Sequence, residues 1–259
     1  LQPEKLKAPE FVEAMQALRP DLGIVIAFRM LPEVIWAMPG LGTFNLHASL
    51  LPQYRGAAPI NWAIINGETE TGVTTFLLNH EIDKGGIIDQ IRVPILPEDN
   101  VGTLYDKLMT TGTALVTSTV DRIAAGDIRP VEQQHIDEST LRPAPKIFKE
   151  DCRIDWTLPG RRIADFIRGL SPYPAAWTEM FREGDEVSQS AKLFSAAFEA
   201  AAHGQPCGTV ESDGRTFIRV ACADGWIIPG ELQIAGKKRL PVRDLLLGWR
   251  DVSQYKFRK

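Results

Sequence analysis

The sequence has few of the residues from which metal sites and covalent catalytic sites are built. Its three cysteines, Cys152, Cys207 and Cys222, lie far apart and form no Cys-x-x-Cys pair, so we expect reduced thiols rather than a disulfide framework. The four histidines lack the paired spacing of metal ligands and lie at positions 47, 80, 135 and 203. No Ser or Cys nucleophile motif supports an acyl-enzyme mechanism. We therefore predict no metal and no covalent intermediate.

Long apolar runs are also absent. No stretch approaches the length of a transmembrane helix, and nothing has the pattern of a signal peptide. The 44% hydrophobic and 24% charged fractions are typical of a globular protein with a substantial core. With 259 residues the chain can form one large domain or two ordinary ones. Together these features predict a cytoplasmic protein.

Charge is distributed unevenly along the chain. Residues 146–259 contain 18 Lys and Arg against 15 Asp and Glu, a net charge of +3. The whole chain carries −4, so residues 1–145 carry −7. A basic half joined to an acidic half favours a polyanionic partner for the basic half. Charge alone, however, is more often explained by an ordinary solvated surface.

In the first 127 residues, short apolar runs alternate with segments of helical spacing. We expect strands at residues 22–28, 43–47, 73–78 and 86–95. We expect helices at residues 9–18, at residues 59–67 and from Val101 toward Ala125, with Asn100 as N-cap and Gly126 at the end. This alternation with short joins predicts an α/β domain with a mostly parallel sheet covered on both faces.

The pattern changes after this region. Residues 128–146 are mostly polar and contain three prolines, which is typical of an extended linker. Beyond it we expect a helix at 160–170 and short strands at 176–180, 192–197, 208–211, 217–222 and 225–231. Short strands with Asp-Gly turns between them predict a small β-barrel. We therefore divide the chain into a first domain at 1–127, a linker at 128–146 and a second domain at 147–259.

Three polar residues are candidates for acid–base chemistry. Asn45 and His47 are two positions apart on one expected strand, so their side chains point to the same face. Asp83 lies in a Gly-flanked loop beyond a helix and a strand, and a parallel sheet could return it to the end of the His47 strand. Asn45 and protonated His47 would stabilise an oxyanion, while His47 and Asp83 would move a proton during acyl transfer to an amine. An isolated Asn-x-His pair is nevertheless more often structural than catalytic.

Motifs along nearly the whole chain resemble those of methionyl-tRNA formyltransferases. The family signature is matched by Phe44-Asn45-Leu46-His47-Ala48-Ser49-Leu50-Leu51-Pro52 and by residues 55–60 and 70–74. Its catalytic loop is matched by Ile82-Asp83-Lys84-Gly85-Gly86, although Lys84 and Gly86 depart from the residues that are commoner there. Further matches lie at residues 145–147, 153–156, 167–174, 231–233 and 236–239.

The resemblance implies a Rossmann-like formyltransferase domain followed by an OB-like barrel that contacts tRNA. It implies transfer of a formyl group from 10-formyltetrahydrofolate to initiator methionyl-tRNA, in translation initiation, with Asn45, His47 and Asp83 as catalytic residues. The folate site is implied to include Ser49, Leu50, Leu51 and Pro52, and also Arg29, Met30 and Leu31. The family normally begins with a strand, a Gly-Thr-Pro turn and a basic loop. None of these is in the sequence, which opens on Leu1-Gln2-Pro3 without an initiator Met, so we expect an N-terminally truncated chain.

The second domain contains a candidate tRNA-binding cluster, Lys237-Lys238-Arg239. Such a cluster can bind phosphates, and a solvated turn is the alternative. Two other functions stay open: a folate-dependent formyltransferase acting on a UDP-amino-sugar, and a non-catalytic RNA-binding fragment. Residues 57–60 and 236–239 favour the tRNA enzyme over the sugar enzyme, and the intact Asn–His–Asp trio argues against the RNA-binding fragment. We expect a monomer that binds initiator methionyl-tRNA and the folate.

Overall fold

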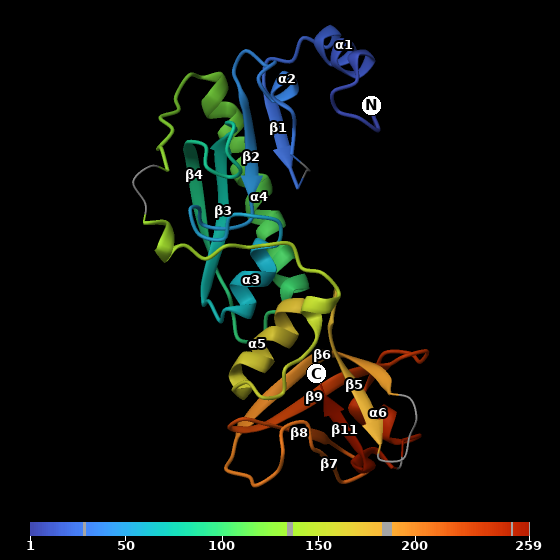
Figure 1. Cartoon of the computed structure of the whole chain (residues 1–259). Helices are drawn as coiled ribbons and strands as arrows, with labels where there is room; N and C mark the ends of the chain where they lie inside the picture. The colour runs from blue at the N-terminus through green and yellow to red at the C-terminus, as the bar shows by residue number, and fades with distance from the viewer. Residues whose placement is uncertain (28–29, 134–136, 183–187, 250, 259) are drawn as a thin grey trace. The chain divides into compact units, whose positions relative to one another are not determined.

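The computed structural model of the chain describes residues 1–27, 30–133, 137–182, 188–249 and 251–258. The chain forms two compact units (Figure 1). The first consists of Leu1–Pro59, Glu70–Pro94 and Tyr105–Lys146. The second consists of Ile60–Thr69, Ile95–Leu104 and Ile147–Lys259. In the part of the chain that the structure describes, no helix is both long and apolar enough to cross a membrane. The same part contains no group of three His, Cys, Asp or Glu side chains suited to hold a metal ion.

The first unit is built on a four-stranded sheet in the order β1-β2-β3-β4. Its strands are β1 (Gly23–Ile26), β2 (Thr43–His47), β3 (Glu70–Leu77) and β4 (Ile87–Pro94). β1 and β2 are parallel, whereas β2 with β3 and β3 with β4 are antiparallel. The fold class is confirmed, but the described sheet is mixed rather than mostly parallel. The loop between β3 and β4 is too short for the crossover that parallel neighbours require.

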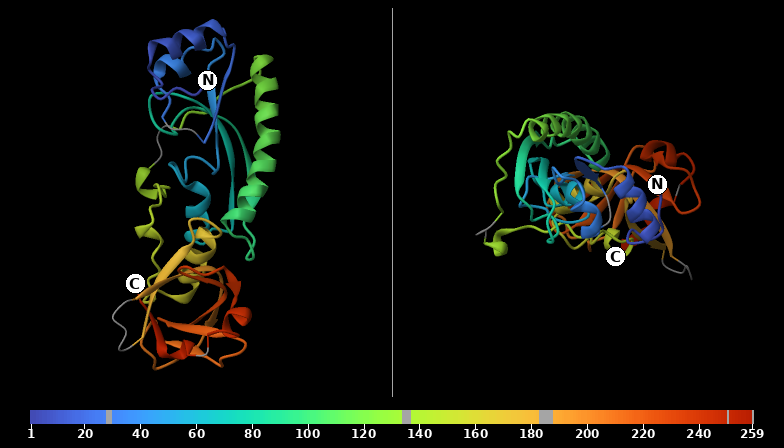
Figure 2. Two further views of the ribbon diagram at one scale, coloured as in Figure 1. Left: turned by 90° about the vertical axis from the view of Figure 1, so that its right-hand side faces the viewer. Right: turned by 90° about the horizontal axis from the view of Figure 1, so that it is seen from above.

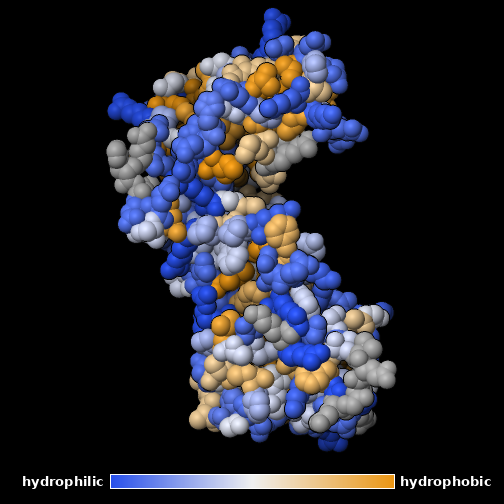
Figure 3. Space-filling model, viewed as in Figure 1, coloured by the Kyte–Doolittle hydropathy of each residue, from blue (hydrophilic) through white to orange (hydrophobic). Residues whose placement is uncertain are grey.

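The described residues before α4 form the helices α1 (Pro9–Ala17), α2 (Glu33–Trp36) and α3 (Pro59–Ile65). The side chains of Ile24 and Ile26 on β1 are 47% and 55% exposed, and Val34 on α2 is 46% exposed. Figure 3 shows apolar residues on the surface around these two elements. Among the described residues β1 pairs only with β2, so it forms an edge of the sheet.

The long helix α4 (Val101–Ala124) lies along one face of this sheet (Figure 2). Phe44 and Ile88 from the sheet and Ile123 from the helix form the buried core between them. The helix approaches closely at Gly112, where a Cβ atom would lie 2.8 Å from the Leu46 side chain. The helix therefore covers one face of β2, the strand that carries Asn45 and His47.

The described residues of 128–146, expected to form a linker, belong to the first unit. Val131 forms a two-hydrogen-bond bridge to Ile87 at the start of β4. Farther along, Ala144 bridges Gly56, and the 3₁₀ helix η1 (Glu138–Thr140) lies between these contacts. Ala144 thus contacts the loop that follows β2, and Gln133 contacts the loop that follows β3.

The second unit is an antiparallel sheet with the strand order β11-β5-β6-β9-β8-β7. The strands are β5 (Ala176–Arg182), β6 (Gln189–Ala200), β7 (Val210–Ser212), β8 (Ile218–Cys222), β9 (Gly225–Ile234), β10 (Leu240–Pro241), which pairs with β9, and β11 (Tyr255–Arg258). A bridge from Thr209 to Lys256 brings the two edges together, so the sheet forms a nearly closed barrel. This confirms the barrel predicted from the spacing of strands and turns.

Helix α5 (Gly160–Leu170) contributes Ile163 and Ile167 to the core of the barrel. The sequence did not predict β10, β11 or the short helix α6 (Val242–Leu246). The two remaining 3₁₀ turns are η2 (Glu150–Cys152) and η3 (Val252–Gln254). Burial raises the pKa of the Cys152 thiol to about 11, so this cysteine is an unreactive core residue.

Candidate active site

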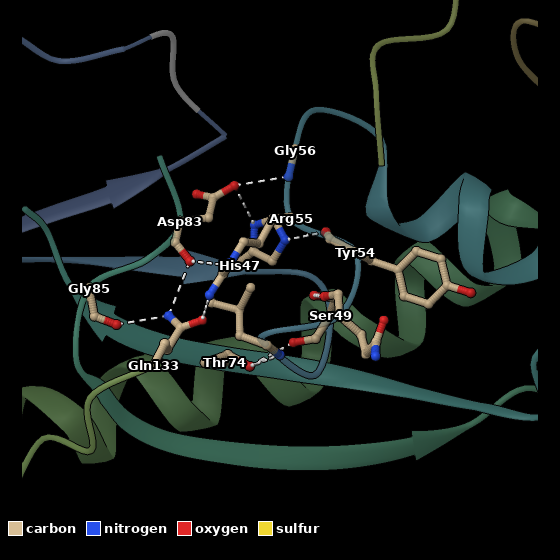
Figure 4. Close-up of polar contacts among 11 residues, drawn as sticks. His47, Ser49, Tyr54, Arg55, Gly56, Thr74, Asp83, Gly85 and Gln133 are labelled. Carbon is tan, nitrogen blue, oxygen red and sulfur yellow. Dashed lines mark hydrogen bonds and ion pairs between the residues drawn. The ribbon is translucent and has the colours of Figure 1, made fainter. Parts of the chain in front are cut away.

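His47 occupies the last position of β2, and its side chain is buried. Its Nε2 lies 2.8 Å from the carbonyl oxygen of Tyr54, in the loop that follows the strand (Figure 4). Because a carbonyl can only accept, the Nε2–H group donates this bond. Nδ1 therefore carries the lone pair of the neutral ring, and it lies 3.9 Å from Oδ2 of Asp83. The nitrogen that can exchange a proton thus faces the carboxylate.

Asp83 reaches His47 by a route that differs from the expected one. β3 runs antiparallel to β2, so the loop of residues 78–86 turns back over the sheet to bring Asp83 close. Gly85 permits this turn, since a Cβ atom there would lie 1.6 Å from the carbonyl oxygen of Leu77. The Asp83 carboxylate accepts a 3.0 Å hydrogen bond from the Gly56 N–H group. The structure therefore brings His47 and Asp83 within the reach of one bridging water.

Asn45 lies two residues before His47 on the same strand. Its Oδ1 atom is buried and has no hydrogen-bond partner among the described residues. A buried amide oxygen without a partner is costly, because most buried polar groups are hydrogen-bonded. The amide is therefore available to a bound molecule on the face of the strand that also carries His47.

The predicted folate residues Ser49, Leu50, Leu51 and Pro52 continue directly from His47. Backbone groups of this loop are bonded to the sheet: the Ser49 carbonyl accepts from Thr74 Oγ1 at 2.6 Å, and the Leu51 carbonyl accepts from Gln90 Nε2 at 2.8 Å. The Ser49 hydroxyl donates to the Gln53 carbonyl at 2.6 Å. The loop is thus fixed by β3 and β4 beside His47.

The second predicted folate segment follows β1. Because β1 and β2 are parallel, with Ile26 opposite Leu46, the residues after β1 leave the sheet at the same end as His47. Met30 is 74% exposed and Leu31 is partly buried. Arg29 lies outside the described residues.

Two residues near Asp83 were not identified from the sequence as part of the site. Arg55 and Gln133 both bond to the Asp83 backbone carbonyl, at 3.2 and 3.1 Å. Arg55 belongs to a motif matched by the family signature, but no role was assigned to it. Gln133 gave no signal at all, because it is 50 positions away in the expected linker.

The predicted tRNA-binding cluster lies in the second unit, at the turn between β9 and β10. Lys237 and Lys238 are exposed. The Arg239 guanidinium instead pairs with Glu231 and lies over the Phe194 ring, 4.1 Å from its centroid. Of the three cations, Arg239 thus has its charge partly offset by a neighbouring carboxylate.

Comparisons with known proteins agree on the relationship of this chain. The family model described as "Formyl transferase" matches residues 1–120, and "Formyl transferase, C-terminal domain" matches residues 146–250. A protein of Bacteroides thetaiotaomicron named methionyl-tRNA formyltransferase is 57% identical over 258 residues, 99% of this chain and 80% of that protein. The protein of the same name from Parabacteroides distasonis is 56% identical over 257 residues, 98% of this chain and 79% of that protein. The chain belongs to the methionyl-tRNA formyltransferase family.

Solved structures show the same fold in more distant proteins. The crystal structure of HypX from Aquifex aeolicus in complex with tetrahydrofolic acid aligns with a TM-score of 0.66 at 24% identity. The alignment covers 92% of this chain and 40% of HypX. The aligned 92% of the formyltransferase chain includes residues of both units.

Proposed function

We propose that this chain transfers a formyl group from 10-formyltetrahydrofolate to the amino group of the methionyl residue on initiator tRNA. The observation that carries the proposal is the buried His47, whose Nδ1 faces the Asp83 carboxylate at 3.9 Å, in a chain 57% identical to a named methionyl-tRNA formyltransferase. Formyl transfer to an amine needs a group that removes a proton from nitrogen and returns it to the leaving nitrogen.

In the proposed reaction the methionyl amine attacks the formyl carbon, and a new C–N bond forms. His47 Nδ1 accepts the proton that the attacking nitrogen loses. The bond from the formyl carbon to the folate nitrogen then breaks, and His47 returns the proton to that nitrogen. Asp83 stabilises the imidazolium in between, and no electrons are exchanged with any further reactant. The Tyr54 carbonyl supports this cycle because it keeps Nε2 protonated throughout.

The tetrahedral intermediate carries negative charge on the former formyl oxygen. We assign Asn45 to this oxygen, together with protonated His47. The Asn45 amide oxygen has no partner among the described residues, so the amide can turn its NH₂ group toward the intermediate. The folate donor is assigned to Ser49, Leu50, Leu51 and Pro52 with Arg29, Met30 and Leu31. The fixed loop after β2 supports this placement, and the chemistry needs no metal.

We also assign a function to each part of the chain. Residues 1–127 carry the catalytic groups, residues 128–146 connect the two parts, and residues 147–259 bind tRNA, with Lys237, Lys238 and Arg239 contacting phosphates. We further propose that the chain is a monomer and that it acts in the cytoplasm, where charged tRNA is found.

The test is a formyl-transfer assay with purified protein and 10-formyltetrahydrofolate. Charged initiator methionyl-tRNA and a UDP-amino-sugar are offered as acceptors in separate reactions, and a variant with Ala at position 47 serves as the inactive control. We expect formylation of the tRNA only. Formylation of the sugar alone would replace the proposed acceptor, and tRNA binding without transfer to either acceptor would make the chain a binding protein.

A further inference from the structure

The backbone that carries Asp83 is held by two side chains to which the proposed reaction gives no chemical step. We infer that Gln133, assisted by Arg55, is a positioning residue that fixes the Asp83 carboxylate beside His47. The inference rests on the proposed function, since it concerns the same proton transfer. It assigns a catalytic contribution to residue 133, in a segment that the sequence indicated only as a linker.

The Gln133 amide makes three hydrogen bonds in this site (Figure 4). Its Nε2 donates to the carbonyls of Asp83 and Gly85 at 3.1 and 2.8 Å. Its Oε1 accepts from Nη2 of Arg55 at 2.7 Å. The Arg55 Nε–H group donates to the same Asp83 carbonyl at 3.2 Å. One buried amide thus joins the two loops that flank the His47–Asp83 pair.

Asp83 needs such support because of its backbone conformation. Its φ of 54° lies in the left-handed region, which is strained for residues other than glycine, although Asp adopts it more readily than most. A residue persists there where surrounding contacts determine it, and such residues cluster at functional sites. The neighbouring residue Lys84 restrains the loop only weakly, because its ion pairs with Glu81 and Glu138 are largely exposed. The buried Gln133 amide is therefore the stronger restraint on the loop.

The segment that carries Gln133 is itself anchored. Two residues earlier, Val131 exchanges two 2.8 Å backbone hydrogen bonds with Ile87 on the far side of the Asp83 loop. Gln133 is 9% exposed, so solvent does not compete strongly for its amide. The Asp83 loop is thus fixed at its carbonyls by Gln133 and at its carboxylate by the Gly56 N–H group. Losing the Gln133 bonds leaves the Asp83 carbonyl with the Arg55 bond and the carboxylate with the Gly56 N–H bond, and it frees the Gly85 carbonyl.

The test is a double-mutant cycle in the complete protein. Gln133→Met keeps the size of the side chain but removes all three hydrogen bonds. Gln133→Glu keeps the acceptor for Arg55 but removes the two donors to the Asp83 and Gly85 carbonyls. Each variant is combined with Asp83→Asn, and kcat and both KM values are measured with methionyl-tRNA and 10-formyltetrahydrofolate. Misplacing a catalytic group by about 1 Å can cost on the order of 10² in rate.

We expect both Gln133 variants to lower kcat by about 10- to 100-fold with little change in either KM. In the Asp83→Asn background we expect the same changes to alter kcat by less than about threefold, because the residue they position is already lost. Asn61→Leu is the matched control: it removes a 2.8 Å amide-to-carbonyl bond to Gly169 in the second unit and should retain full activity.

Equal losses in both backgrounds would overturn the inference, because they would show that Gln133 acts independently of Asp83. Changes confined to KM would overturn it as well. If Gln133→Met lowers the Tm, its loss of activity could come from lower stability. The kinetics of Gln133→Glu then test the inference, because this variant preserves the bond to Arg55. Absence of transfer by the unaltered protein would instead overturn the proposed function, so the two failures are distinguishable.

Discussion

Asp83 in the first unit and Asp213 in the second both lie in short loops between antiparallel strands, and both carboxylates accept backbone hydrogen bonds. Asp213 accepts from the N–H groups of Arg215 and Thr216 and from the Thr216 hydroxyl, all within three residues. Among the described residues, the Asp83 carboxylate accepts from one N–H group, that of Gly56, which is 27 positions away. The same carboxylate faces the His47 ring, with Oδ2 of Asp83 3.9 Å from Nδ1 of His47.

The difference separates an aspartate that stabilises a turn from one that is available for chemistry. The donors around Asp213 hold its pKa well below the usual 3.8, with the Thr216 hydroxyl as the largest cause. This carboxylate is fully engaged by its own turn. Asp83 is positioned by distant segments, so its geometry depends on the whole first unit. A carboxylate that is held at its backbone but left open toward a histidine is suited to proton transfer.

The largest expected effect comes from removing the group that Asp83 faces. We predict that His47→Ala lowers kcat by about 10²–10⁴-fold, because it removes the acid–base group of the proposed reaction. The KM for 10-formyltetrahydrofolate should change much less. Steady-state kinetics with both substrates varied measure this directly. Near-normal kcat with a much higher folate KM would mean that His47 only shapes the pocket.

The second prediction compares the two aspartates themselves. Asp83→Asn should lower kcat by roughly 10²-fold or more, because a neutral amide cannot stabilise the His47 imidazolium. Asp213→Asn should leave kcat unchanged, since the described hydrogen bonds of that side chain lie within its own turn. Both variants keep the shape of the side chain, so the same assay compares them. Similar losses in the two variants would remove the distinction drawn between the loops.

Sequence reasoning succeeded where the determining contacts are local. The helix cap at Asn100, the end of α4 before Gly126 and the Asp213-Gly214 turn all follow from nearby residues, and each lies close to its predicted place. The strand Thr43–His47 was predicted with its observed bounds, because Gly42 precedes it and a loop that contains Ser49 and Pro52 follows it.

It failed where contacts span long sequence separations. The antiparallel pairing of β2 and β3 was not predicted, because β3 is buried over six consecutive residues, a pattern more typical of a parallel strand. Gln133 carries no local signal, since its hydrogen bonds go to residues 48 to 78 positions away. The motif resemblance named Asn45, His47 and Asp83 together, but the side chains that hold Asp83 in place required the structure.

The third prediction extends the comparison to cations of the second unit. All three cations are exposed, but in the part of the chain that the structure describes only Arg239 forms an ion pair, with Glu231. Replacing both lysines with Gln should lower the slope of log affinity for tRNA against log salt by roughly two, about one per phosphate contact. Replacing Arg239 alone with Gln should lower the slope by less, because Glu231 already offsets part of the Arg239 charge. A filter-binding series over salt concentration measures both slopes, and an unchanged slope in the lysine variant would place the tRNA surface elsewhere.

The smallest expected effect concerns the stability that Asp213 contributes. Its pKa in the folded protein is lowered from the usual 3.8, so its contribution to folding is complete above pH 3.8 and is lost as the pH falls toward the folded value. Asp213→Ala should therefore lower the Tm at neutral pH by a few degrees at most, since the side chain is exposed. The difference from the unaltered protein should shrink as the pH is taken down to about 2. Thermal unfolding followed by circular dichroism across this range measures it. A Tm difference that stayed constant with pH would mean that the turn is stabilised by its shape rather than by the ionised carboxylate.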